Sequence, residues 1–349
     1  MMKQNVLQIL IYFLSKNLKL ILIHSSSMFL SKISKIFSPK EFQMKKIISI
    51  LCVFAVILTS LCISVYAVDT SYKPYEDSRY FEYGDYDIHY RVIPAKGEQK
   101  GRIMMLHGFL CSTFAWRNLA AELSEEGYEC VLADIPNFGY STRENDEMTI
   151  VDREIIITEL MKSIAPMNEW ILAGHSMGGG VAVNIAINNP VKSLLLYCPA
   201  PQSEFPEMME GLITSEPMKF MMDTFFNHGT RIGPVVKLVI FFATMDWDFA
   251  MNYDVSGVTN AVQYDRFGSG MCEMMYNVKP TDLENASKIT CPVLLCQATD
   301  DIILNATMKD QMNSAFPDAT TYTVEGGGHQ CIENRAEELC NVTVDFLEK

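Results

Sequence analysis

The sequence of 349 residues contains no two cysteines at the C-x-x-C spacing, so it gives little support for a metal site. It also lacks internal repeats and low-complexity linkers, and a chain of this length can bury one large core, with or without an insertion. Positive charge is scarce outside the N-terminus. The first 67 residues hold eight of the 28 Lys and Arg residues but only one of the 42 Asp and Glu residues. The acidic remainder argues against nucleic acid or an anionic membrane surface as a partner.

The N-terminus has the pattern of a targeting segment. The basic residues Lys45 and Lys46 precede a nearly continuous apolar run over 47–65, and Ala67 provides a small residue at a cleavage junction. We therefore predict a signal peptide over 44–67 and an exported protein, secreted or held at the cell surface. The alternative is an uncleaved membrane anchor over 47–65, because that run is long enough to span a bilayer. Residues 1–43 form a doubtful extension, which we interpret as a start site placed too far upstream.

The sequence does not show which of its cysteines would pair in disulfides. Export permits disulfides, but their connectivity cannot be derived from one sequence. Several of these cysteines fall in apolar strand patterns, where a small buried side chain is the simpler interpretation. Eight cysteines follow the predicted signal: Cys111, Cys130, Cys198, Cys272, Cys291, Cys296, Cys331 and Cys340.

From about residue 80 the chain alternates predicted strands and helices. A hairpin over 80–83 and 86–93 comes first, because Gly84-Asp85 separates two strand-like runs. Apolar strands that do not alternate with polar residues indicate a mainly parallel sheet with helices on both faces. These later strands are expected over 102–106, 128–133, 170–175, 192–198, 292–298 and 320–324. Among the helices between and after them, one is expected to open at the capping-box pattern that begins with Thr149 and to run to Ile164, and two others are expected over 306–315 and 334–347. The core would therefore consist of 68–201 and 284–349.

The alternation stops over 202–283, which we interpret as a helical insertion after the sixth strand. This segment contains ten Met and twelve aromatic residues. Adaptable apolar side chains at a strand end suit the roof of an apolar pocket, that is, a lid. The alternative is that they pack a small core of the insertion itself.

The strongest chemical signal is Gly174-His175-Ser176-Met177-Gly178, a G-x-S-x-G pattern between a predicted strand and helix. A serine at such a turn is lifted clear of the backbone, and the helix N-terminus favours negative charge beside it. Ser176 is therefore the candidate nucleophile. By itself the pattern is weak, because a glycine-rich turn can have the same letters.

A serine nucleophile requires a base and an acid that orients the base. His329, behind Gly326-Gly327-Gly328, is the candidate base because it follows the last predicted strand. Asp300 and Asp301 both follow the 292–298 strand. We choose Asp300 as the acid and expect Asp301 to cap the next helix. Glu204 is a third, remote option.

The oxyanion of such a reaction needs two backbone N–H donors. Met177 offers one, because it follows the nucleophile at the helix start. Phe109 offers the other, in the His107-Gly108-Phe109 loop after the first parallel strand.

Together these motifs resemble the α/β-hydrolase superfamily, in its lid-bearing branch of serine esterases, lipases and peroxidase-like enzymes. The likeness covers roughly 78–349 and also includes DIPNFGYS at 134–141. The resemblance implies an α/β-hydrolase fold, a catalytic triad of Ser176, Asp300 and His329, and oxyanion donors at Phe109 and Met177. Gln297 and Leu304 depart from the family's usual residues, which leaves the choice between Asp300 and Asp301 open.

We therefore expect a serine hydrolase that cleaves carboxylic esters with an apolar acyl or aromatic group through an acyl-enzyme. It would use no cofactor and no metal, bind a small-molecule ester, and touch a membrane only through an uncleaved N-terminal segment. The alternatives are a C–C bond hydrolase or a cofactor-free perhydrolase with the same triad. From another class, the alternative is a ligand-binding protein that hardly turns over.

Overall fold

In a computed structural model, residues 73–145 and 147–349 are described; the predictions for 1–43 and for the signal peptide at 44–67 lie outside these residues. The described chain forms an eight-stranded sheet in the order β1-β2-β4-β3-β5-β6-β7-β8. β1 and β2 are antiparallel to their neighbours, and the other strands are parallel. The strands are β1 (Arg79–Tyr83), β2 (Tyr86–Ile93), β3 (Gly101–Leu106), β4 (Tyr128–Ala133), β5 (Trp170–His175), β6 (Ser193–Tyr197), β7 (Val293–Ala298) and β8 (Thr320–Val324).

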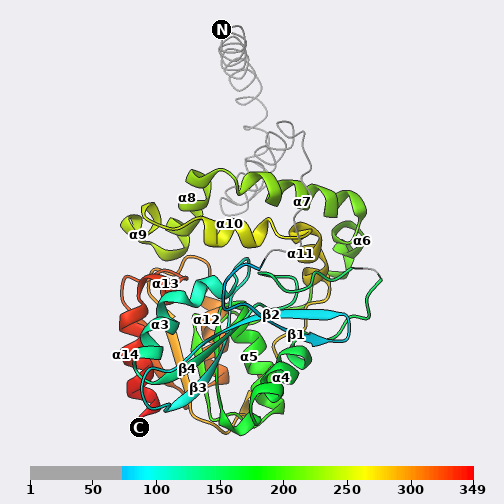
Figure 1. Ribbon diagram of the computed structural model, residues 1–349. Coiled ribbons are helices and arrows are strands. Elements are labelled where there is room, and N and C mark those ends of the chain that lie inside the picture. Colours follow the sequence, from blue (N-terminus) through cyan, green and yellow to red (C-terminus); the bar gives the residue numbers. More distant parts are fainter. Residues whose placement is uncertain (1–72, 146) are drawn as a thin grey trace, which may run out of the picture. The chain divides into compact units, whose positions relative to one another are not determined.

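Helices cover both faces of the sheet (Figure 1). One face packs against α4 (Arg153–Ile164) and α5 (Met177–Asn188), and the other packs against α3 (Arg117–Glu125) and α14 (Ala336–Leu347). Successive strand residues therefore enter different cores, as Ile103 and Met104 on β3 do. This explains why the central strands are apolar throughout, and it confirms the predicted α/β-hydrolase fold class.

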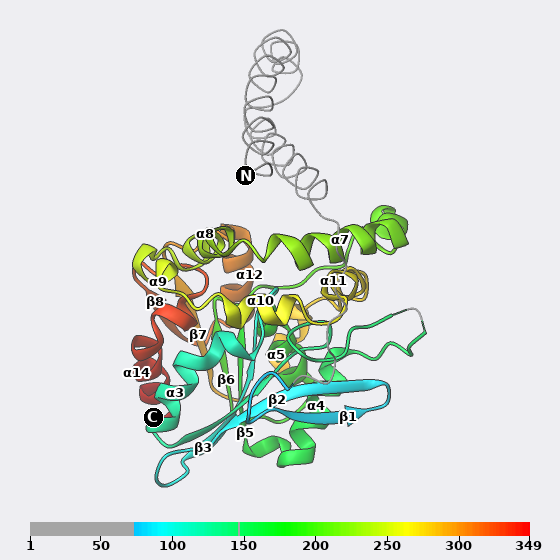
Figure 2. The same cartoon turned by 45° about the horizontal axis from the view of Figure 1, so that its top comes forward.

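Helices fill the connection between β6 and β7, in the region predicted as an insertion (Figure 2). They are α6 (Glu210–Ile213), α7 (Glu216–Gly229), α8 (Gly233–Thr244), α9 (Trp247–Met251), α10 (Ser256–Val262) and α11 (Phe267–Tyr276). α8 and α9 form a small core of their own around Val236, Ile240, Ala250 and Tyr253. Other insertion residues, Phe226, Phe267 and Met271 among them, join the main core. In the described part of the chain, no helix is both long and apolar enough to cross a membrane.

Two predicted helix caps differ from the structure. Thr149 does not open α4, because the helix begins at Arg153 and its N-cap residue Asp152 makes no side-chain cap bond. Asp301 does not cap the helix after β7. That helix, α12 (Ala306–Ala315), is capped by Asn305, whose side chain accepts a hydrogen bond from Met308 N. Asp301 is therefore available for another partner.

The remaining short helices complete the sequence of elements. Single turns precede α3, β5, α6 and β7, and α13 follows the loop that carries His329. They are η1 (Thr113–Trp116), η2 (Met167–Glu169), η3 (Glu207–Met209), η4 (Leu283–Lys288) and α13 (Cys331–Asn334).

Candidate active site

Ser176 lies on a strained turn between β5 and α5. Its φ of 51° and ψ of −121° place it in a region that side chains other than glycine rarely adopt. The neighbouring glycines make this turn possible through close packing. A Cβ at Gly174 would collide with the carbonyl of Gly178, and a Cβ at Gly178 would collide with the carbonyl of Leu106. The G-x-S-x-G pattern is thus a steric requirement of the turn.

His329 lies beside Ser176, as the sequence predicted. Its Nε2 is 2.8 Å from Ser176 Oγ, although 153 positions separate the two residues in the chain. Both side chains are almost fully buried. The carbonyl oxygen of His329 accepts a hydrogen bond of 2.9 Å from His175 Nε2. His329 is thus held through its ring by Ser176 and through its backbone carbonyl by His175.

The acid in contact with His329 is Asp301, which corrects our choice of Asp300. Asp301 Oδ2 accepts a hydrogen bond of 2.8 Å from His329 Nδ1. Asp301 Oδ1 accepts from the backbone N–H groups of Ile303 and Leu304, at 2.9 and 3.0 Å. Asp300 is exposed, and its N–H donates to Gly327 O, which extends the contact between the ends of β7 and β8. Only the next residue turns back into the buried site.

The charge states suit a proton relay from Ser176 to His329. Burial alone would raise the pKa of Asp301, but the hydrogen bond and charge of His329 and the two backbone N–H groups lower it below its ordinary value. Asp301 is therefore an anion at neutral pH, and it holds the proton of His329 on Nδ1. Nε2 is then free to accept the proton of Ser176 Oγ. Burial, and next the charge of His329, lower the pKa of His175 to about 3, so that ring is neutral.

Phe109 and Met177, the two expected oxyanion donors, both lie close to Ser176. A Cβ at Gly108 would lie 3.0 Å from Ser176 Cβ, so the loop that carries Phe109 passes directly beside the serine. Met177 is the first residue of α5. Within residues 73–145 and 147–349, neither the Phe109 N–H nor the Met177 N–H has a hydrogen-bond acceptor from the protein. Two unpaired donors near the nucleophile can hold a developing negative charge.

The loops that carry these residues expose large apolar side chains. Phe109 is 41% exposed and is followed by the exposed Leu110, while Ile302 and Ile303, directly after Asp301, are 60% and 54% exposed. Such exposure is unusual next to fully buried polar groups and indicates a surface suited to an apolar ligand. The third proposed acid, Glu204, is exposed to solvent.

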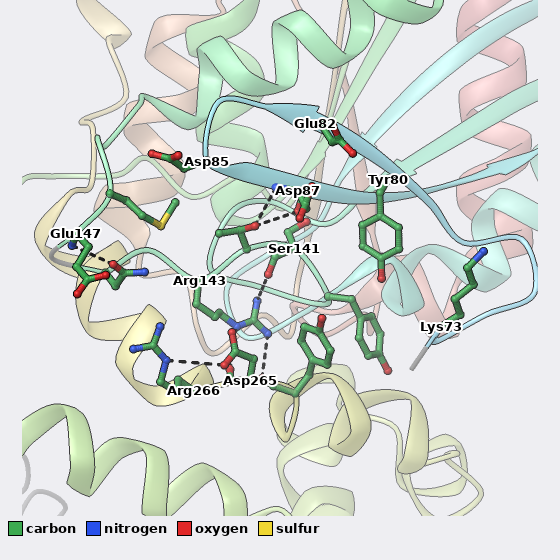
Figure 3. A pocket seen from close by; sticks show the side chains of 15 residues that line it. Lys73, Tyr80, Glu82, Asp85, Asp87, Ser141, Arg143, Glu147, Asp265 and Arg266 are labelled. Atoms are coloured by element: carbon green, nitrogen blue, oxygen red, sulfur yellow. Dashed lines mark hydrogen bonds and ion pairs between the residues drawn. The ribbon is translucent and has the colours of Figure 1, made fainter. Parts of the chain in front are cut away.

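A large cavity in the described structure lies elsewhere. It has a volume of about 810 Å³ and lies between the β1–β2 hairpin, the loop after β4 and the segment before α11 (Figure 3). Its walls are polar and carry several carboxylates, such as Glu82, Asp87 and Asp265, and none of the residues at the Ser176 site lines it. This cavity therefore does not supply the apolar surface beside the serine.

One group of side chains in the described structure could hold a metal ion. Ligand atoms of Cys198, Asp301 and His329 lie within 4.8 Å of one another, and all three residues are buried. The eight cysteines predicted to follow the signal are all free thiols here. Sequence reasoning missed this group because its members follow three different strands, and only the fold brings them together.

Comparisons with known proteins agree with this geometry. A family model described as "alpha/beta hydrolase fold" matches residues 101–335. An uncharacterized hydrolase, YugF, of Bacillus subtilis is 21% identical over 277 residues, which cover 77% of this chain and 97% of that protein. A 2-hydroxy-6-oxononadienedioate/2-hydroxy-6-oxononatrienedioate hydrolase of Cupriavidus pinatubonensis is 24% identical over 293 residues, covering 77% and 95%. The solved structure of an enol-lactonase from Burkholderia xenovorans aligns with a TM-score of 0.60 at 18% identity, covering 78% of this chain and all of that one (100%).

Proposed function

Because this chain belongs to the α/β-hydrolase fold family, we propose that it is a serine hydrolase that cleaves carboxylic esters through an acyl-enzyme. One observation carries the proposal: Ser176 Oγ, His329 and Asp301 form a continuous hydrogen-bonded relay at the turn between β5 and α5, with links of 2.8 Å. A hydroxyl is a weak nucleophile until a base takes its proton, and this relay provides that base.

The mechanism follows from the positions of these groups. Ser176 Oγ attacks the acyl carbon while His329 Nε2 takes its proton, and Asp301 stabilises the imidazolium that forms. The N–H groups of Phe109 and Met177 hold the oxyanion; loss of one such donor typically slows a reaction by about 10²–10³-fold. His329 then protonates the leaving alcohol. Water, deprotonated by the same ring, finally hydrolyses the acyl-enzyme.

The substrate class follows from the apolar side chains near the relay. Phe109, Leu110, Ile302 and Ile303 are exposed although they are large and apolar. Their burial against an acyl or aromatic group would add about 25 cal/mol for each Å² of apolar surface removed from water. We therefore propose esters with an apolar acyl or aromatic group, with the helical insertion as the lid over this surface.

Replacement of the nucleophile tests the reaction. We expect Ser176→Ala to lose turnover of p-nitrophenyl esters and labelling by a fluorophosphonate, because both need the activated hydroxyl. Ser203→Ala is the matched control, since Ser203 is exposed and outside the relay. Full labelling of Ser176→Ala would exclude Ser176 as the nucleophile. A product burst equal to the amount of enzyme, with no steady state, would show a binding protein with little turnover.

C–C bond hydrolysis is a second candidate, because the dioate hydrolase from Cupriavidus resembles this chain along most of both sequences. The two reactions can share one triad, so residue substitutions cannot separate them. A substrate panel can: p-nitrophenyl esters of increasing acyl length against a vinylogous 1,5-diketone. Faster turnover of the diketone than of every ester would favour the second candidate.

A further inference from the structure

Two buried thiols lie next to the acid–base pair and have no role in the proposed hydrolysis. Cys198 directly follows β6, and Cys331 begins α13, two positions after His329. Their Sγ atoms are 3.6 Å apart, and both side chains are fully buried. A thiol of this kind usually serves as a small apolar residue, but here a carboxylate and an imidazole lie beside it.

The ligand atoms of three buried side chains lie close enough together to share one zinc ion. Zinc binds sulfur at about 2.3 Å and nitrogen or oxygen at about 2.0–2.2 Å, which places two ligand atoms about 3.3–3.8 Å apart. Sγ of Cys198, an oxygen of Asp301 and a ring nitrogen of His329 all lie within 4.8 Å of one another. Cys331 is not a member of this group, although its Sγ is 3.6 Å from that of Cys198. Three protein ligands leave the fourth position of a zinc ion open, as in catalytic zinc sites.

The backbone at Cys198 is also unusual. Its φ of 43° lies in the left-handed region, where residues other than glycine are uncommon. Its N–H is fixed by a hydrogen bond of 2.8 Å to Cys296 O. Glycine would fit this backbone with less strain, yet the position carries a thiol next to Asp301. Strain of this kind, about 1–3 kcal/mol, is concentrated at functional sites.

We propose that Cys198, Asp301 and His329 bind Zn²⁺, and that the zinc-bound protein is an inactive form of the hydrolase. On binding, the Cys198 thiol releases its proton to solvent. The proton on His329 Nδ1 moves to Nε2, because Nδ1 becomes the zinc ligand. A ring protonated at Nε2 cannot take the proton of Ser176, so hydrolysis stops although Ser176 is not itself displaced.

Zinc binding can be tested without any enzyme activity. The metal-free protein is titrated with Co²⁺, which reports thiolate ligation by a charge-transfer absorption, and the bound Co²⁺ is then displaced with Zn²⁺. We expect one equivalent to bind, with the absorption of a four-coordinate thiolate site. Since this spectrum is measured on the unaltered protein, it does not depend on whether a variant folds. No thiolate absorption, or binding without thiolate character, would overturn the proposal.

Two cysteine variants locate the site. Cys198→Ser should weaken zinc binding by about 100-fold, because it removes the thiolate ligand of the zinc ion. Cys291→Ser is the matched control. Cys291 is a half-buried thiol just before β7, at the opposite end of the strand from Asp301, and its loss should leave zinc affinity unchanged. Equal affinity in Cys198→Ser and Cys291→Ser would overturn the proposal.

The inhibition rests on the proposed function, whereas the binding does not, so the two can fail separately. With an active esterase, we expect zinc to abolish turnover at one equivalent, a chelator to restore it, and Cys198→Ser to resist zinc relative to its own metal-free rate. An esterase that binds zinc at this site and keeps full activity would overturn the inhibition. If no ester is cleaved while Co²⁺ still shows thiolate ligation, the proposed function is wrong and the proposed metal site is supported.

Discussion

At the scale of single residues, the position of Asp301 next to His329 is the reason for proposing Asp301, and not Asp300, as the acid that orients His329. Asp300 and Asp301 are adjacent in the sequence, but one is exposed and the other is 7% exposed and hydrogen-bonded on both carboxylate oxygens. The difference arises because Asp300 still follows the direction of β7 through its N–H bond to Gly327. Asp301 is the first residue after this contact, so its side chain reaches the histidine.

The two aspartates give a sharp test. We expect Asp301→Asn to lower kcat by about 10³–10⁴-fold, because an amide cannot hold His329 in the tautomer that accepts the serine proton. Asp300→Asn should stay within about twofold of the unaltered enzyme. Steady-state kinetics on one p-nitrophenyl ester compare the pair. The reverse order of the two effects would restore Asp300 as the acid.

Local geometry decides which of the site residues could be predicted from the sequence. Ser176 and His329 were predictable as neighbours because each follows a strand of one parallel sheet and has glycines that permit a tight turn. The choice between Asp300 and Asp301 was wrong because it depends on how many residues past β7 the backbone contact with Gly327 continues. The loop after β8, which contains Gly327, decides where this contact ends. The sequence pattern of β7 alone carries no information about that loop.

At the scale of elements, the end of α8 is bonded to the loop that carries His329. Gly328 N donates to Thr244 O at 3.2 Å, and Gln330 N donates to Ala243 O at 2.7 Å. These bonds satisfy carbonyls at the C-terminus of α8 that have no partner within the helix. A Cβ at Gly328 would lie 2.5 Å from the carbonyl carbon of Thr244. The insertion thus contacts, through backbone, the loop that carries the proposed base His329, and Gly328 permits that contact.

A methyl group at Gly328 tests this coupling. We expect Gly328→Ala to lower kcat by about tenfold or more, because a shift of the loop by even a fraction of an ångström misaligns His329 with Ser176. Gly233→Ala is the matched control at the other end of α8, where a Cβ would meet nothing within 4 Å. Steady-state kinetics and fluorophosphonate labelling rates of both variants provide the measurement. Equal rates in the two variants would contradict the coupling.

The elements themselves were largely predictable, and their contacts were not. The strand over 320–324 and the helix over 306–315 were expected with the bounds that the structure shows, although Asn305 and not the expected Asp301 caps the helix. The helix expected over 334–347 is instead divided into α13 and α14. The bonds between α8 and the His329 loop join segments about 85 residues apart, and no local pattern encodes such a pairing.

At the scale of the whole molecule, Arg143 joins the core to the insertion. Its guanidinium is buried and donates to Ser141 O and Gly139 O in the core loop, at 2.9 and 2.6 Å. It also donates to backbone oxygens in the insertion, those of Ala261, Tyr264 and Asp265, at 3.3–3.4 Å. Figure 3 shows Arg143 beside Asp265. Burial lowers the pKa of Arg143 to about 10, so it keeps its charge at neutral pH. One side chain thus satisfies backbone groups from both parts.

Loss of this link should destabilise the whole fold. We expect Arg143→Ala to lower the free energy of unfolding by about 3 kcal/mol or more, because several buried carbonyls lose their donor at once. Arg79→Ala is the control, since Arg79 is exposed on β1, and it should change stability by less than about 0.5 kcal/mol. Urea unfolding, with limited proteolysis of 202–283, measures both. Equal unfolding midpoints for the two variants would show that Arg143 does not join the parts.

The order of the active-site residues along the chain has a consequence for biosynthesis. The hydroxyl arrives with β5, but the carboxylate and the imidazole arrive only with the loops after β7 and β8, close to the C-terminus. If Ser176 acts as proposed, a chain still emerging from the ribosome has no base to activate this serine until its last strands have docked. On the same proposal, a polypeptide that ends before residue 329 cannot hydrolyse an ester, whatever remains of its fold.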